Sequence, residues 1–252
     1  LSCSSAASDV YKRQVFEPTA LNELIPDWKE KEAPLNSPAT KDIVKFMISE
    51  NSSFNIPFPS FLIPTFNNHG NYVMSLANFT RWLATQAESL GVEIFPGFTA
   101  AEVIFEENVV KGVLTGEMGI SKDGEKKPSY QPSMELRGKY TVFAEGCRGH
   151  LGKQLIKKFN LDENRDPQHY GIGFKEIWDI SPEDHKEGTV MHTMGWPSNG
   201  TISGSYFYHG ENNQVYLGYV VPLDYENPHL SPFDEFQPVS YTHLRAHETI
   251  HY

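Results

Sequence analysis

Apolar residues follow two different periods along the chain, and the change falls near residue 160. Within residues 71–90 an apolar stripe recurs at helical spacing, which predicts an amphipathic helix ending at Gly91. Beyond residue 170, short β-branched and aromatic runs are separated by Pro, Gly and Asn, a pattern typical of an antiparallel sheet. These runs cover residues 171–180, 189–195, 201–209 and 214–221. We therefore expect a chain that is α/β first and mostly β second.

The residues between these two regions predict further strands and a second helix. Apolar runs at 92–96, 102–105 and 109–113 have strand length, and the last two have the pattern of a hairpin. A strand at 134–143 leads into a helix from His150 to Phe159, through the turn Ala144-Glu145-Gly146-Cys147-Arg148-Gly149. Such a turn can leave backbone N–H groups free where a phosphate or a flavin edge could lie. Close packing of small residues explains the same turn, so its spacing leaves both interpretations open.

Residues 43–66 form an apolar segment that is interrupted by Pro57, Pro59 and Pro64. The prolines oppose a buried helix or a central strand, and the aromatic content opposes full solvation. The segment is interpreted either as a loop that covers the core or as a surface region that dips into a membrane interface. No run of about 18 apolar residues, the length that spans a bilayer, occurs in the chain.

Both ends of the chain have an artificial pattern. Residues 5–14 and 239–243 can be encoded by one DNA segment in opposite orientations, which resembles a transposase-derived adapter for sequencing libraries. We therefore expect residues 1–14 and 239–252 to be adapter-derived tails that do not belong to the native protein. Three regularly spaced histidines in the second tail are then excluded as metal ligands: His243, His247 and His251.

Composition narrows the classes of function. The chain has 21 basic and 32 acidic residues, a net charge of −11, and the stretch without tails has 18 and 30, a net charge of −12. This balance argues against a nucleic-acid partner, which favours a basic surface. Without the tails Cys147 is the one cysteine left, so a zinc site or a four-cysteine cluster cannot be built from this stretch.

Several short motifs, in order, carry a resemblance to a known family. They are Pro26-Asp27-Trp28-Lys29-Glu30, Asn67-Asn68-His69-Gly70-Asn71-Tyr72, Phe143-Ala144-Glu145-Gly146-Cys147-Arg148-Gly149-His150-Leu151, Gln168-His169-Tyr170-Gly171-Ile172-Gly173, Gly195-Trp196-Pro197 and Leu230-Ser231-Pro232-Phe233. Together they resemble the electron transfer flavoprotein–ubiquinone oxidoreductase family, over residues 15–237. The motifs are individually weak, and their order and spacing carry the resemblance.

The resemblance implies two partial domains. Residues 15–160 would be part of a glutathione-reductase-type FAD domain, with a membrane-dipping apolar segment at about 43–66. Residues 161–238 would be a truncated antiparallel β domain that binds quinone. The fold class implied is thus α/β plus β.

The resemblance also implies site residues. FAD would lie near Val103 and near Ala144, Glu145 and Gly146. Similar proteins carry a glycine pair at the quinone, where this chain has Ser203 and Gly204. Because a serine removes clearance that glycine provides, either the quinone ring sits differently or the serine offers it a hydrogen bond. No catalytic side chain and no metal ligand is expected within the chain.

The function implied is electron transfer at a membrane. Members pass electrons from reduced electron transfer flavoprotein through FAD and a 4Fe-4S cluster to ubiquinone, which implies a peripheral protein of the bacterial inner membrane or of the mitochondrial inner membrane on its matrix side. The present chain lacks a G-x-G-x-x-G turn and the cluster's cysteines, so the fragment alone is predicted to be inactive. The alternatives are an FAD oxidoreductase of the nitrogen-fixation or geranylgeranyl-reductase type, and a β-rich binding module without catalysis.

Overall fold

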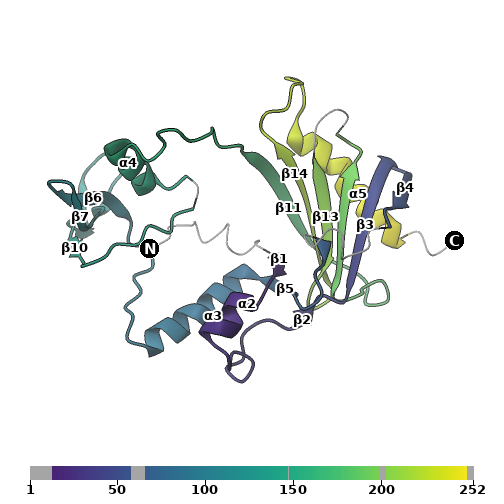
Figure 1. Cartoon of the computed structure of the whole chain (residues 1–252), viewed down its shortest axis with the longest axis horizontal. Coiled ribbons are helices and arrows are strands. Elements are labelled where there is room, and N and C mark those ends of the chain that lie inside the picture. Colours follow the sequence, from purple (N-terminus) through teal and green to yellow (C-terminus); the bar gives the residue numbers. More distant parts are fainter. Residues whose placement is uncertain (1–12, 58–65, 147, 199–202, 249–252) are drawn as a thin grey trace. The chain divides into compact units, whose positions relative to one another are not determined.

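The computed structural model describes residues 13–57, 66–146, 148–198 and 203–248, which form two compact units (Figure 1). The larger unit contains residues 13–85 together with residues 168–248, and the smaller contains residues 86–167. This division differs from the expected boundary at residue 160, because residues 13–85 fold with residues 168–248.

The larger unit is built on a six-stranded sheet in the order β11-β14-β13-β12-β3-β4. All neighbouring strands are antiparallel except β12 and β3, which are parallel. The four strands expected between residues 171 and 221 are confirmed as β11 to β14. The strands are β3 (Lys41–Ser49), β4 (Ser52–Asn55), β11 (Gly171–Asp179), β12 (Thr189–Gly195), β13 (Gly204–His209) and β14 (Gln214–Pro222).

The strand β3 corrects the expectation that residues 43–66 exclude a central strand. It pairs with β12 on one side and β4 on the other. The prolines that suggested a loop begin at Pro57, after β4 has ended, so they do not interrupt the hydrogen bonds of either strand. Residues 58–65 lie outside the described residues.

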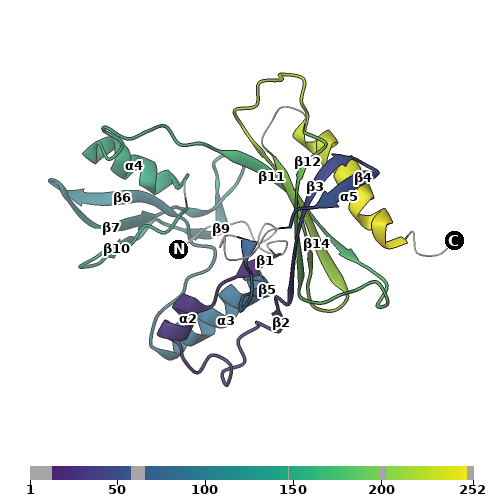
Figure 2. The ribbon, with the colours of Figure 1, turned by 45° about the vertical axis from the view of Figure 1, so that its right-hand side comes forward.

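Helix α5 (Pro232–Glu248) covers one face of this sheet, as Figure 2 shows. Alternate residues of β14 point to this face, and with the helix they form a core of Phe207, Val215, Leu217, Tyr219, Val221, Phe236 and Val239. The hydroxyl of Ser240 donates a hydrogen bond of 2.6 Å to Glu176. The helix therefore continues through residue 239, where the second adapter tail is expected to begin, and Val239 and Ser240 pack against the sheet.

A second, smaller sheet packs against the face of the six-stranded sheet that lies opposite α5. Its strands are β1 (Arg13–Phe16), β5 (Tyr72–Ser75) and β2 (Ser37–Pro38), in the order β1-β5-β2. Val73 of β5 contacts Val190 and Tyr208 of the six-stranded sheet. Helices α2 (Thr19–Leu24) and α3 (Leu76–Ser89) enclose a further core of Leu21, Trp28, Ala33, Leu35, Met74 and Phe79. The amphipathic helix expected before Gly91 is thus confirmed, beginning at Leu76.

The smaller unit contains the expected hairpin and second helix. Strands β6 (Ala100–Glu106) and β7 (Val109–Thr115) pair around Glu107, whose φ of 56° is left-handed, and β10 (Glu135–Arg137) adds a third strand. Strands β8 (Met118–Ile120) and β9 (Lys126–Gln131) form a separate ribbon. Helix α4 (His150–Phe159) packs against β6.

Two strands expected in this unit do not form as predicted. Residues 92–96 are not a strand, and of residues 134–143 only 135–137 are paired. Tyr140 and Val142 are 92% and 87% exposed. A strand requires a neighbour for its backbone N–H and C=O groups, and no strand among the described residues pairs with residues 92–96 or 139–143.

Candidate functional site

The smaller unit contains a cavity of about 360 Å³ beside the turn that precedes α4. Of the four residues predicted to bind FAD, Ala144 and Glu145 line this cavity, while Val103 and Gly146 are not among its lining residues. Its walls come from β7, β10, the extended residues 138–145 and Leu151 of α4. The cavity is thus the place in this unit where a cofactor could contact Ala144.

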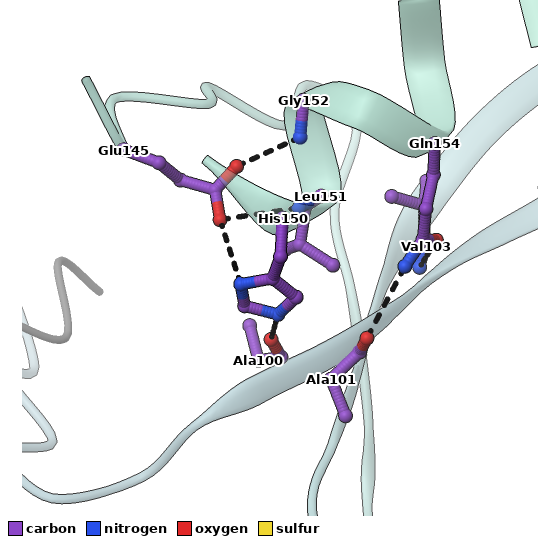
Figure 3. A network of polar contacts seen from close by, with 8 residues as sticks. All are labelled: Ala100, Ala101, Val103, Glu145, His150, Leu151, Gly152 and Gln154. Atoms are coloured by element: carbon purple, nitrogen blue, oxygen red, sulfur yellow. Dashed lines mark hydrogen bonds and ion pairs between the residues drawn. The ribbon is translucent and has the colours of Figure 1, made fainter. Parts of the chain in front are cut away.

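Glu145 binds the first turn of α4, as Figure 3 shows. Its carboxylate accepts hydrogen bonds from the backbone N–H of Gly152, at 2.8 Å, and of Leu151, at 3.3 Å. The Nδ1 of His150 lies 3.4 Å from the same carboxylate, and its Nε2 lies 2.6 Å from the carbonyl oxygen of Ala100. Because a carbonyl only accepts, Nε2 carries a hydrogen in this arrangement.

This contact corrects the expectation of free N–H groups at the start of α4. An anionic side chain of the chain itself occupies the position where a phosphate would be favoured by the helix N-terminus. Gly149, at the N-cap position, has no side chain that could take this role, so Glu145 supplies the missing acceptors.

The backbone of Val103 is also engaged within the unit. Its N–H donates to Oε1 of Gln154 at 3.1 Å, and Nε2 of Gln154 donates to the carbonyl of Ala101 at 3.3 Å (Figure 3). Gly146 has a φ of 80°, a backbone conformation that favours glycine, so the turn itself explains why a glycine stands at this position. The N–H donors of Val103, Leu151 and Gly152 are therefore bonded within the chain and are not available to FAD in this conformation.

A second candidate site lies on the face of the six-stranded sheet opposite α5. Residues that face each other across neighbouring strands share one face of a sheet, so the register defines rows. One row contains Gly173, Val220, Gly204, Met194 and Phe46. The next contains Lys175, Gly218, Tyr206, His192 and Val44. Val220 and Phe46 are 44% and 37% exposed, so this part of the face is open within the larger unit.

Polar side chains gather at the edge of these rows. The Nε2 of His192 lies 2.8 Å from the hydroxyl of Tyr208, and burial lowers the pKa of His192 although Asp42 opposes the shift. The carboxylate of Asp42 accepts hydrogen bonds from the backbone and side chain of Asn68, at 2.9 and 2.6 Å. Burial raises the pKa of both Tyr206 and Tyr208, so both phenols remain protonated at neutral pH.

Ser203 and Gly204, the residues predicted to bind quinone, face opposite sides of the sheet. The hydroxyl of Ser203 donates to Ser198, which in turn bonds the hydroxyl of Tyr219 in the core beneath α5. Gly204 lies in the open row, where an added Cβ would be 3.0 Å from the carbonyl of Thr193. The structure therefore places the hydroxyl of Ser203 away from the face that Gly204 exposes.

The sequence analysis did not identify His192, Tyr206 and Tyr208 as site residues. Period-two alternation in β13 could have found two of them, because Gly204, Tyr206 and Tyr208 must share one face. His209, which follows Tyr208, is buried on the other face and accepts a hydrogen bond of 3.1 Å from the backbone of Lys186.

The described residues contain neither a candidate metal site nor a candidate membrane-spanning helix. Within residues 13–57, 66–146, 148–198 and 203–248, no group of three His, Cys, Asp or Glu residues could hold a metal ion. No helix in these same ranges is long and apolar enough to cross a membrane. Cys147 lies outside the described residues.

The chain shares its fold with parts of known structures that are distant in sequence. A crystal structure of FqzB matches with a TM-score of 0.54 and 13% identity, over 92% of this chain and 50% of that one. A geranylgeranyl bacteriochlorophyll reductase-like protein from Thermoplasma acidophilum matches with a TM-score of 0.51 and 11% identity, over 86% and 47%. At these identities the likeness concerns the fold alone.

One family model and several relatives match the sequence of this chain. Residues 170–251, which include strands β11 to β14, match the family described as ETF-QO, ubiquinone-binding. The electron transfer flavoprotein-ubiquinone oxidoreductase of Pseudomonas aeruginosa is 57% identical over 93% of this chain and 43% of its own length. The mitochondrial proteins of that name from Dictyostelium discoideum and Bos taurus are 49% and 50% identical, over 93% and 88% of this chain and 38% and 36% of their lengths. The chain is thus similar in sequence to electron transfer flavoprotein-ubiquinone oxidoreductases, and it spans about two fifths of the length of these relatives.

Proposed function

We propose that this chain is the quinone-binding part of an oxidoreductase that passes electrons from reduced electron transfer flavoprotein to ubiquinone. The observation that carries the proposal is the match of residues 170–251 to a ubiquinone-binding family, because it falls on the sheet whose open face contains Gly204. A glycine without a Cβ lets a flat ring approach the backbone closely. The neighbouring His192, Tyr206 and Tyr208 provide polar groups for the ring's oxygens.

A titration with ubiquinone-1 in non-ionic detergent, followed by calorimetry, tests this proposal. The chain should bind with saturation at one site. The variant Gly204→Ala should bind about tenfold more weakly, since its methyl group would occupy the open row. Gly173→Ala, at the sheet edge in the same row, is the matched control and should bind within about twofold of the wild type. Absence of saturable binding by the wild-type chain would refute the proposal.

The proposal assigns FAD and a 4Fe-4S cluster to the whole protein. FAD supplies the flavin that carries electrons, and the protein's groups orient it. Val103, Ala144, Glu145 and Gly146 remain the proposed contacts, although Glu145 and Val103 would first have to release their present hydrogen bonds. The chain's two cysteines, Cys3 and Cys147, are too few for a four-cysteine cluster, so the chain as given is expected to show no cluster absorbance.

The same proposal puts the β3–β4 hairpin against a membrane surface, at the bacterial inner membrane or on the matrix side of the mitochondrial inner membrane. Phe46, Ile48 and Phe54 of this hairpin are 37%, 61% and 52% exposed, and the two phenylalanine rings stack at 5.6 Å. Exposed apolar groups of this kind favour insertion into the interfacial region of a bilayer.

Flotation with phospholipid vesicles tests the membrane contact. The wild-type chain should float with the vesicles, and Ile48→Asp should reduce the bound fraction about tenfold, because a charge would enter the apolar interface. Leu24→Asp is the control, since Leu24 is a 75% exposed leucine on α2 outside the hairpin. An equal loss for both variants would contradict a role specific to the hairpin.

A further inference from the structure

Tyr206 has a buried hydroxyl without a hydrogen-bond partner among the described residues. Buried polar groups are nearly always paired, so an exception calls for an explanation such as a missing ligand. The other such atom in the described ranges is Nε2 of His185, whose ring packs 5.3 Å from His209. His209 belongs to the face that α5 covers, whereas Tyr206 belongs to the opposite face, in the row next to the one that contains Gly204.

The position of the Tyr206 ring is fixed by its neighbours. It stacks on Tyr208 with ring centroids 4.7 Å apart, and the ammonium of Lys175 lies 5.5 Å from its centre. The ring and hydroxyl lie over Gly218 so closely that a Cβ on this glycine would collide with them. The hydroxyl is therefore held over the backbone of β14, beside the row that contains Gly204.

The neighbouring tyrosine does not share this property. The hydroxyl of Tyr208 is paired with His192, so of the two stacked phenols only Tyr206 lacks a hydrogen-bond partner among the described residues. Gly204 and Tyr206 are two residues apart on one face of β13, which separates them by about 7 Å. This distance is on the scale of one substituted benzoquinone ring, so a ring placed over Gly204 could bring an oxygen to Tyr206.

We infer that the hydroxyl of Tyr206 donates a hydrogen bond to a carbonyl oxygen of a quinone ring that lies over Gly204. This inference rests on the proposed function and adds to it a residue that selects a carbonyl-bearing ring. Burial raises the pKa of Tyr206, which keeps the phenol protonated and able to donate. In the complex, this hydrogen bond contributes to quinone binding. In the free protein the buried hydroxyl has no partner, which lowers the stability of the folded state.

The variant Tyr206→Phe tests the inference in the 252-residue chain. It keeps the ring that stacks on Tyr208 and removes only the hydroxyl. Calorimetric titration with ubiquinone-1 in detergent should show about five- to tenfold weaker binding, the loss expected for one hydrogen bond. Without ligand, the Tm of the variant should be equal to that of the wild type or higher by about 2–4 °C, because an unpaired buried group has been removed.

Tyr219→Phe is the matched control, since its hydroxyl lies on the opposite face and is paired with Ser198. It should leave quinone affinity unchanged. If the wild type binds and Tyr206→Phe binds equally well, the inference is overturned and the proposed function stands. Equal weakening in both variants, or a lower Tm for Tyr206→Phe, would assign its hydroxyl a structural role and also overturn the inference. A wild-type chain that does not bind ubiquinone-1 would overturn both.

Discussion

The six-stranded sheet of the larger unit and residues 138–143 of the smaller unit have similar apolar sequences and different structures. In β14, Val215, Leu217 and Val221 are completely buried. In the smaller unit, Tyr140 and Val142 are almost completely exposed. The sequence preference for strand is the same in both regions, and the difference is that β14 has a hydrogen-bonded neighbour on each side. The comparison shows that a strand-forming sequence is stabilised by its neighbours more than by its own residues.

The largest effect should come from truncating apolar residues in the two regions. Leu217→Ala should lower the free energy of unfolding by about 2–5 kcal/mol, because it leaves a cavity beneath α5. Val142→Ala should change it by less than about 0.5 kcal/mol, because its side chain already contacts solvent. Urea denaturation followed by far-UV circular dichroism measures both. A cost of more than about 1 kcal/mol for Val142→Ala would mean that residues 138–143 are packed in solution.

A smaller effect on stability is expected from the polar contact between Glu145 and the start of α4 in the smaller unit. Glu145→Ala should destabilise this unit by about 0.5–2 kcal/mol, since two N–H groups at the start of α4 lose their acceptor. Glu102→Ala, an exposed glutamate in β6, is the control and should have little effect. Hydrogen exchange at Leu151 and Gly152 measures the change directly. Unchanged exchange at both amides would show that Glu145 does not cap the helix.

The smallest effect concerns the exposed ion pair between Glu106 of β6 and Arg137 of β10. Arg137 lowers the pKa of Glu106 through its hydrogen bond, at an exposed position. A lowered carboxyl pKa stabilises the folded state above the unfolded value of 4.5, and this contribution is lost as the pH falls through the lower folded value. Arg137→Gln should therefore weaken the unit slightly at pH 7 and less at pH 3. Urea midpoints at both pH values measure it, and addition of salt should reduce the difference. A difference that does not decrease between pH 7 and pH 3 would exclude this origin.

Local patterns predicted the elements whose partners are close in sequence or follow a regular alternation. The hairpin of β6 and β7, helix α3 and strands β11 to β14 belong to this group. Strand β3 was missed because the prolines that follow it dominated the interpretation of residues 43–66, while its partner β12 lies far along the chain. No pattern within residues 43–66 indicates a partner strand so far along the chain.

The candidate site was predictable to a similar extent. Gly204 was identified, and alternation along β13 also accounts for the opposite direction of Ser203. The role of Glu145 was not predictable, because the acceptor for α4 comes from four residues before the N-cap position rather than from that position itself. The unpaired hydroxyl of Tyr206 depends on the absence of a side chain at Gly218, in another strand.

The parallel pairing of β3 with β12 has a consequence for synthesis of the chain. Val44 and His192 are neighbours in the sheet, and the whole smaller unit, residues 86–167, is encoded between them. During synthesis, residues 86–167 must therefore be translated before β12 is available to pair with β3. Until then, the apolar residues of β3 remain exposed to solvent. Closing so long a loop is slow, because its entropy is lost before the contacts form. Prior folding of the smaller unit would shorten this loop, so we expect residues 86–167 to aid closure of the six-stranded sheet when they fold first.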